Sequence, residues 1–213
     1  QLNKTALQAH GLDKNGQLYK ANFFEFHRDE DVIKLADDPD YDQTKFEEKL
    51  EIKGDNDHTK LIAMLNALND YSVPMSDILG KYFDTENLAY WMAFQLLTGN
   101  SDTQSRNMYL YSPTNSDTFY VLDWDNDGML MRKECDIKQR SDGKSWENGI
   151  SNYWGNMLFS RCLQTKSFRT VLDKAIKDEY KYMNSNRINS MVKHYRSITE
   201  QYVWKMPDSM YEG

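Results

Sequence analysis

The chain has 213 residues, of which 28% are charged and 13% are aromatic, and its formal net charge is −7 at pH 7. Disordered chains are poor in aromatic residues, so this composition predicts a folded protein, and the length fits one domain with a sizeable core. The negative charge argues against nonspecific binding of nucleic acids or anionic membranes, which requires basic surfaces, and no apolar run approaches the ~20 residues of a membrane span.

The N-terminal quarter of the chain predicts a turn, a strand and a short helix. Asp13–Gly16 is typical of a tight turn, and the Tyr- and Phe-rich run Gln17–Phe26 is typical of a strand. Residues 29–43 are strongly acidic and are expected to form a solvated connector. Thr44–Ile52 predicts a short helix that ends before Gly54.

An amphipathic helix is predicted after residue 58, because apolar side chains recur there at i, i+3, i+4 and i+7. These side chains are Leu61, Met64, Leu65 and Leu68. Pro74 separates this helix from the next one.

Thr85–Thr98 predicts the central buried helix of the domain. Asp84 is a good N-cap for this helix, and Gly99 is a good residue to end it. Apolar or aromatic side chains occupy nearly its whole circumference, so we expect it to be buried on all sides. Its C-terminal end leads into a loop that carries Asp102.

A β-hairpin and further helices are predicted in the second half of the chain. Asn107–Tyr111 and Thr118–Leu122 are strand-like runs joined by a segment rich in turn residues. After an irregular stretch over residues 138–149, apolar spacing predicts a helix around Phe168–Ala175 and a last helix over Ile188–Tyr202, whose apolar side chains should form a packing seam. The predicted fold class is therefore α+β and predominantly helical.

The two cysteines, Cys135 and Cys162, make no disulfide framework and fit no zinc-binding spacing. Two isolated buried thiols are the favoured interpretation, and a single bridge between them is the alternative.

The residues between 99 and 128 carry the chemistry that we expect of this chain. Asp102 precedes Asn107 by five positions, and the predicted hairpin leads from there to Asp123, Asp125 and Asp127. Phosphoryl transfer from a nucleotide needs a carboxylate that orients the attacking hydroxyl, an amide oxygen on metal and a carboxylate that bridges metal to phosphate. The Asp-x4-Asn spacing equals that of the protein-kinase catalytic loop, but the preceding His-Arg and the later Phe-Gly are absent, which excludes a conventional protein kinase.

The acidic cluster after the hairpin allows three interpretations. In the first, Asp125 and Asp127 ligate Mg²⁺ or Mn²⁺ beside a nucleotide. In the second, Asp123, Asp125, Asp127 and Glu134 form a calcium loop, because the sequence satisfies the pattern D-x-D-x-D-G-x5-E. A strand and not a helix is predicted before this loop, and no second loop pairs with it, which weakens the calcium interpretation. The third is an acidic turn, just as Asp102 alone could simply tighten its own loop.

The stretch FDTENLAYWMAFQLLTGNSDTQSRNMYLY, followed by FYVLDWDND, resembles the CotH family of spore-coat-protein-H kinases. The family pattern is a D-x-x-N helix, then G-N-x-D, an aromatic strand after Asn, and a W-D-x-D turn. The resemblance covers most of the chain and implies an atypical kinase-like fold, in which this chain supplies the C-terminal lobe and its β-hairpin carries the active-site Asp cluster. It also implies ATP-dependent phosphorylation of a protein substrate, and a bacterial cell-surface or spore-coat location outside the cytoplasm.

The resemblance assigns a role to each matching residue. Asp102 matches the catalytic Asp of G-N-x-D, and Asn107 matches the Asn before the aromatic strand. Asp125 matches the metal-binding Asp of W-D-x-D, and Asp127 is a further candidate ligand. Arg106 stands where the family often has His, and it is a candidate phosphate contact or a solvated loop residue.

The chain also departs from the family pattern. Asp123 replaces the usual Pro before Trp, and this replacement creates the calcium-loop match. The nucleotide-gripping strands of the family, with their phosphate-binding Lys, should precede residue 17, and neither Lys20 nor Lys53 can be assigned to that role. We therefore expect a single CotH-like domain over residues 1–213 that lacks those strands, an internal piece of a longer precursor. Two functions remain open: a protein kinase, at least in the parent protein, or a noncatalytic surface module with a calcium loop.

Overall fold

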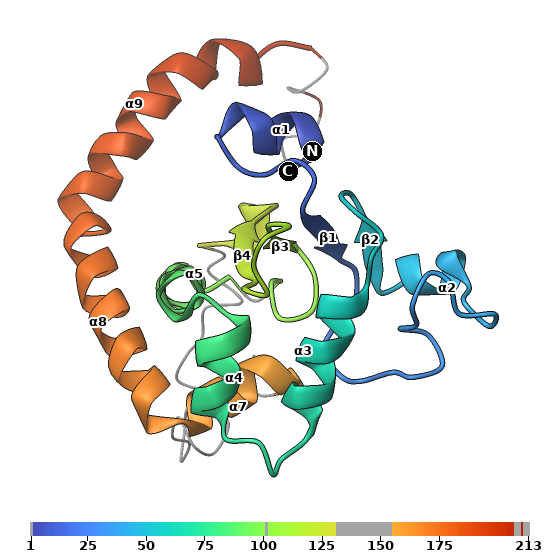
Figure 1. Cartoon of the computed structure of the whole chain (residues 1–213). Coiled ribbons are helices and arrows are strands. Elements are labelled where there is room, and N and C mark those ends of the chain that lie inside the picture. The colour runs from blue at the N-terminus through green and yellow to red at the C-terminus, as the bar shows by residue number, and fades with distance from the viewer. Residues whose placement is uncertain (1, 101, 131–154, 207–209, 211–213) are drawn as a thin grey trace. The chain divides into compact units, whose positions relative to one another are not determined.

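The computed structural model describes residues 2–100, 102–130, 155–206 and 210 of the chain. The chain divides into two compact units, Gln1–Ile176 and Lys177–Gly213. The first unit contains a small antiparallel sheet with helices around it, and all the described candidate site residues lie within it (Figure 1).

The sheet has four strands in the order β2-β1-β3-β4, and every neighbouring pair is antiparallel (Figure 1). The strands are β1 (Gln17–Ala21), β2 (Leu50–Ile52), β3 (Met108–Ser112) and β4 (Tyr120–Asp123). Strand β3 pairs with β1 on one side and with β4 on the other, so that Leu110 lies opposite both Tyr19 and Val121. The predicted hairpin is confirmed, and the N-terminal strand extends it.

The two faces of the sheet are buried against different partners. Consecutive side chains of a strand point to opposite faces, and Tyr19 and Leu110 face the main core while Leu18 and Tyr109 face the other side. On that other side they pack with Leu7 of the short helix α1 (Lys4–Ala9). Burial on both faces explains why β3 reads as a continuous apolar and aromatic run.

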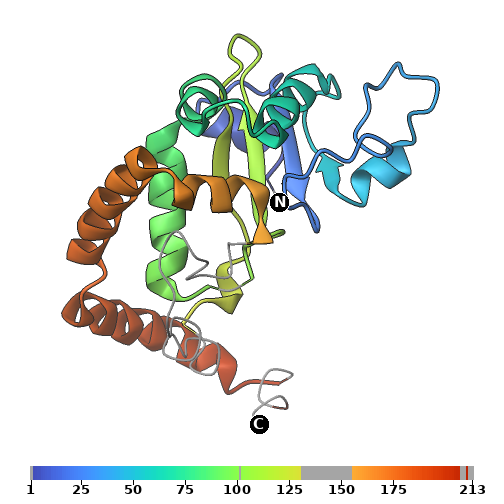
Figure 2. The same cartoon turned by 90° about the horizontal axis from the view of Figure 1, so that it is seen from below.

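Helices pack around the main-core face of the sheet. They are α3 (Thr59–Asn69), α4 (Met75–Tyr82), α5 (Thr85–Thr98), α7 (Met157–Gln164) and the first part of α8 (Lys166–Tyr182). The predicted apolar stripe of α3 is buried along its whole length. Figure 2 shows α7 beside α5, where the Phe159 ring stacks on Trp91 with 5.4 Å between centroids.

Helix α5 has the predicted bounds and ends. The Asp84 carboxylate accepts a hydrogen bond from the backbone N–H of Asn87, and Gly99 ends the helix in the left-handed conformation. Seven of its fourteen residues are buried, whereas Tyr90, Phe94, Leu96 and Leu97 are half-buried, so the prediction of burial on all sides holds only in part. Its C-terminal end therefore has a fixed position from which the Asp102 loop departs.

Two sequence predictions in the N-terminal region are wrong in part. The predicted helix Thr44–Ile52 is only α2 (Gln43–Glu47), and Leu50–Ile52 forms strand β2. These residues extend because they pair with β1, which would otherwise present an unpaired edge. The predicted strand Gln17–Phe26 ends at Ala21, because Phe23 and Phe26 adopt positive φ angles of 56° and 61°.

The second unit consists, in its described part, of the end of α8 and the helix α9 (Ser185–Val203), which Asn184 caps. The predicted helix is confirmed, but the expected packing seam is not, because Met191, Tyr195 and Ile198 are exposed. The described part of this unit offers no further element against which such a seam could be buried.

Cys162 is buried in α7 with a free thiol, and burial raises its pKa. Cys135 and the predicted irregular stretch 138–149 lie outside the described residues. Among the described helices, none combines the length and the apolar character that a membrane crossing requires.

A buried histidine joins the sheet to the acidic connector. His58 bonds through Nδ1 to the Tyr19 hydroxyl at 2.9 Å and through Nε2 to the Tyr41 hydroxyl at 3.2 Å. Its ring stacks on Phe46 with 4.1 Å between centroids. Burial lowers the pKa of His58 from 6.5 to about 4, although the negative charge of Asp57 acts to raise it.

The titration of His58 makes stability depend on pH. The unfolded chain takes up the proton near pH 6.5, whereas the folded chain resists it until about pH 4. Stabilisation is therefore complete above pH 6.5 and is lost as pH falls toward 4. We expect the free energy of unfolding from urea titrations to fall by about 2 kcal/mol between about pH 7.5 and pH 5. The decrease should vanish in His58→Gln and persist in the control His10→Gln, and an unchanged decrease in His58→Gln would contradict this assignment.

A buried arginine holds the connection between α3 and α4. Arg161 of α7 is 6% exposed. Its guanidinium donates hydrogen bonds to the backbone carbonyls of Leu68, Asp70 and Val73, and lies 5.0 Å from the ring centroid of Tyr71. Carbonyls at a helix end have no partner within the helix, so Arg161 satisfies groups that would otherwise be buried without one.

Replacing this guanidinium should destabilise the first unit. We expect Arg161→Met to lower the free energy of unfolding by about 3 kcal/mol, since it leaves buried carbonyls unsatisfied, and Arg161→Lys to recover only part of the loss, since Lys lacks the planar fork. Urea titration measures both changes. Exposed Arg196→Met is the matched control, and equal stabilities of Arg161→Met and this control would refute the role.

Candidate functional site

The register of the hairpin places two loops at the same end of the sheet. Met108, the first residue of β3, lies opposite Asp123, the last residue of β4. The Asp102 loop leads into β3, and the acidic turn follows β4. Both loops therefore lie at the open end of the hairpin. The site depends on this antiparallel pairing of residues that are fifteen positions apart in the sequence.

Asp102 lies at the centre of a small polar cluster. Its Oδ2 accepts a hydrogen bond from the Asn107 amide nitrogen at 2.8 Å. Its Oδ1 accepts a hydrogen bond from Arg106 Nε at 2.8 Å and a second one from Arg106 Nη2. The structure thus brings together three of the residues that the sequence predicts for the site. It also gives Arg106 a partner, the catalytic candidate itself, that sequence reasoning did not foresee.

Three residues of the two loops adopt left-handed backbone conformations. Asn107 has a φ of 57°, Asp125 a φ of 56° and Leu130 a φ of 59°. Asn and Asp tolerate this conformation better than other non-glycine residues, whereas for Leu it is uncommon. Such conformations persist only where the surrounding structure imposes them, and they concentrate at functional sites.

The acidic turn after β4 packs directly on the Asp102 loop. Residues Asn126–Gly128 form a 3₁₀ turn, and the flanking Asp125 and the enclosed Asp127 are exposed. A Cβ on Gly128 would lie 3.0 Å from Asn100 Oδ1 and 3.2 Å from the Asp102 Cβ. Only glycine therefore allows this approach without displacement, and it brings the backbone of the acidic turn against the Asp102 loop.

A network of buried amides connects the two loops beneath the surface. Gln95 of α5 and Asn100 are 1% and 2% exposed, and the Asn100 amide nitrogen donates to Gln95 Oε1 at 2.9 Å. Asn126 Oδ1 accepts from Asn100 at 3.3 Å and from Gln95 at 3.4 Å. Sequence reasoning missed Gln95 and Asn126. The signal that could have found Gln95 is its polar side chain among the apolar residues on either side of it in α5.

Asp123 is engaged with this network. Its Oδ1 accepts a hydrogen bond from the Gln95 amide nitrogen at 2.7 Å, and burial raises the pKa of Asp123 against the effect of that bond. Glu134, the last residue of the predicted calcium loop, lies outside the described residues. Within the part of the chain that the structure describes, no three or more His, Cys, Asp or Glu side chains gather as a metal-holding group.

The Asp102 loop is also supported from its other side. The backbone N–H of Phe24 donates to the Ser105 carbonyl at 2.7 Å, and the Asn156 amide at the start of α7 donates to the Gln104 carbonyl at 2.7 Å. The Arg106 guanidinium lies 5.5 Å from the ring centroid of Phe23, which is exposed. No sequence motif pointed to these supports, because they come from segments far away in the chain.

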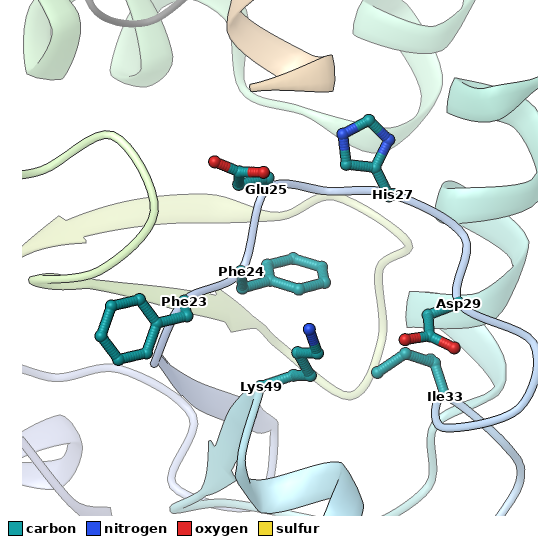
Figure 3. Close-up of a pocket in the computed structure, with 7 residues that line it drawn as sticks. All are labelled: Phe23, Phe24, Glu25, His27, Asp29, Ile33 and Lys49. Carbon is teal, nitrogen blue, oxygen red and sulfur yellow. The ribbon is translucent and has the colours of Figure 1, made fainter. Parts of the chain in front are cut away.

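A pocket opens beside this supporting segment. It is lined by Phe23, Phe24, Glu25, His27, Asp29, Ile33 and Lys49 (Figure 3). Figure 3 shows Lys49, which lies between α2 and β2, reaching toward the segment that carries Phe24 and Glu25. The lining combines two carboxylates with one amine, so it favours neither sign of ligand charge, and none of the sequence-predicted site residues belongs to it.

The two lysines considered for phosphate binding are both held by one carboxylate. Lys20 lies 3.5 Å from Glu51, and Lys53 lies 2.6 Å from the same side chain. The paired Glu51 has a lowered pKa, chiefly because of the hydrogen bond from Lys53. Both lysines therefore have a structural partner on strand β2.

Comparison with known proteins identifies the family of the chain. Residues 1–212 match the family model described as CotH kinase protein. None of the curated proteins matches the chain significantly. The family match covers nearly the whole sequence, and it includes every residue of the two loops described above. This chain therefore belongs to the CotH kinase family.

Proposed function

We propose that this chain is a metal-dependent protein kinase domain that transfers the γ-phosphate of ATP to a Ser or Thr hydroxyl of a surface or coat protein. The observation that carries the proposal is the contact of Asp102 with Asn107 at 2.8 Å, with the Asp125–Gly128 turn packed on the same loop. Family membership supports kinase chemistry. The extracytoplasmic, bacterial location is part of the same proposal and rests on the family resemblance.

The residues present fit a divalent cation with nucleotide. Asp125 and Asp127 offer exposed carboxylates, and Asn107 offers its amide oxygen, since its amide nitrogen donates to Asp102. Mg²⁺ and Mn²⁺ are hard cations that are held by one or two carboxylates and complete their shell with water and phosphate oxygens. An open, exposed set of oxygen donors suits them. A bound metal would neutralise charge on the phosphates.

Asp102 is the group that we assign to the acceptor hydroxyl. The hydroxyl oxygen forms a bond to the γ-phosphorus, the bond from that phosphorus to the β–γ bridging oxygen breaks, and ADP leaves. The hydroxyl proton passes to the Asp102 carboxylate. The hydrogen bonds from Arg106 and Asn107 fix the orientation of this carboxylate. We assign to the Arg106 charge the role of offsetting the charge of the transferring phosphoryl group.

The calcium-loop module is the alternative proposal for the same turn. It would use Asp123, Asp125, Asp127 and Glu134. The bond from Gln95 to Asp123 favours the kinase interpretation, because it directs a carboxylate that the calcium loop needs as its first ligand toward α5.

Transfer of radiolabelled phosphate from ATP to dephosphorylated casein, with Mg²⁺ or Mn²⁺, tests the proposal. We expect Asp102→Asn and Asp125→Asn each to lower the rate by about 10²–10⁴-fold, because one removes the proton acceptor and the other a metal ligand. Asp117→Asn, a change of exposed charge at the opposite end of the hairpin, is the matched control and should keep the wild-type rate.

A second measurement separates the two interpretations of the turn. Calorimetric titration should show that wild type binds Mn-ATP and that Asp125→Asn does not. Binding of Ca²⁺ alone, without any binding of Mn-ATP and without phosphate transfer, would overturn the kinase proposal and support the calcium module.

A further inference from the structure

We propose that Gln95 is a positioning residue of the phosphotransfer site, whose buried amide fixes the Asp102 loop relative to the acidic turn. The inference rests on the proposed function and adds a residue that does not touch the reacting atoms. Gln95 is located on α5 and is 1% exposed. A polar side chain at such a position requires partners, because an unsatisfied buried amide is destabilising.

The oxygen of this amide acts on the Asp102 loop. Gln95 Oε1 accepts a hydrogen bond from the Asn100 amide nitrogen at 2.9 Å. The oxygen of Asn100 in turn accepts from the backbone N–H of Asp102 at 3.2 Å. Gln95 thereby orients the Asn100 side chain, which accepts the hydrogen bond from the Asp102 backbone.

The nitrogen of the same amide acts on the turn. Gln95 Nε2 donates to Asp123 Oδ1 at 2.7 Å and to Asn126 Oδ1 at 3.4 Å. These two residues flank Asp125, so the backbone on both sides of the candidate metal ligand is tied to one point on α5. The left-handed conformation of Asp125 needs such support from its surroundings.

The Gln95 amide can make both sets of contacts at once. Its oxygen accepts while its nitrogen donates, whereas a carboxylate only accepts and a thioether does neither to a comparable degree. Because Gln95 and Asn100 are buried, water does not easily replace a partner that either of them loses. A misplacement of catalytic groups by ~1 Å can cost about 10²-fold in rate, so we expect loss of this amide to affect the chemical step more than the binding of substrate.

A charge-swap experiment tests the role with four main proteins, and Asp123→Asn and Gln8→Met serve as controls. The main proteins are wild type, Gln95→Met, Gln95→Glu, and Gln95→Glu combined with Asp123→Asn. Gln95→Met keeps the volume without the hydrogen bonds. Gln95→Glu places a carboxylate against Asp123. In the double variant the new amide at position 123 can donate to the new carboxylate at position 95, which can still accept from Asn100.

Steady-state phosphate transfer to casein gives the kinetic outcome. We expect kcat to fall about 30- to 100-fold in both single variants, with KM for casein within about twofold of wild type. The kcat of the double variant should be at least about tenfold higher than that of Gln95→Glu. Asp123→Asn on its own should not raise kcat above the wild-type value. Exposed Gln8→Met is the matched control for the Gln-to-Met change and should leave kcat unaltered.

Amide hydrogen exchange gives an outcome that does not depend on activity. The N–H of Asp102 should exchange faster in Gln95→Met than in wild type, while the amides of β3 keep their protection. Equal exchange at Asp102 in both proteins, or a lost kcat that the double variant fails to recover, overturns the positioning role.

The experiment separates the two proposals. A wild type without phosphate transfer overturns the proposed function, and the kinetic role of Gln95 falls with it. A wild type that transfers phosphate with the same kcat as Gln95→Glu overturns the positioning role alone.

Discussion

The candidate site of this protein depends on one hydrogen-bond network, in which the buried Gln95 and Asn100 and the half-buried Asn126 connect a helix end to two loops. The residues of the proposed chemistry lie before the first strand and after the second strand of the hairpin, and antiparallel pairing brings the two loops to the same end of it. Pairing does not fix the position or the orientation of one loop relative to the other. The amide network supplies this remaining constraint, and burial makes it strong because few waters compete for its donors and acceptors.

The scaffold around the network explains how strained residues persist in it. Asn107 and Asp125 have left-handed conformations, each of which costs of order 1–3 kcal/mol. They lie directly before β3 and shortly after β4, and the hairpin is buried on both faces. The chain between them and the strands therefore has little freedom to relax. Strain at these two positions is stored because the sheet, α5 and the close approach of Gly128 leave no alternative path.

The chain distributes its supports over distant segments. The Asp102 loop is held below by α5 and laterally by Phe24 and Asn156, which belong to the N-terminal segment and to the start of α7. Elsewhere, Arg161 connects segments through backbone carbonyls, and His58 does so through tyrosine hydroxyls. All of these polar groups are satisfied across long sequence separations. No local pattern indicates such contacts, so sequence reasoning could not predict Asn126 or Phe24 as parts of the site. Gln95 alone gave a local signal, because it is a polar residue among the apolar residues of the second half of α5.

The sequence by itself determined the helices with clear caps and apolar stripes and the hairpin, and it marked the candidate residues for the proposed chemistry. Asp84 and Gly99 fix the ends of α5 by local hydrogen bonding and backbone freedom, and Asp102 and Asn107 are marked by their spacing. Only the tertiary structure decided that Leu50–Ile52 is a strand, because the unpaired edge of β1 outweighs local helix preference. It alone also decided that Arg106 binds Asp102 and that Asp123 turns toward Gln95. The reason is physical: a side chain with several partners of similar chemistry within reach takes the one that the packing of distant segments places beside it.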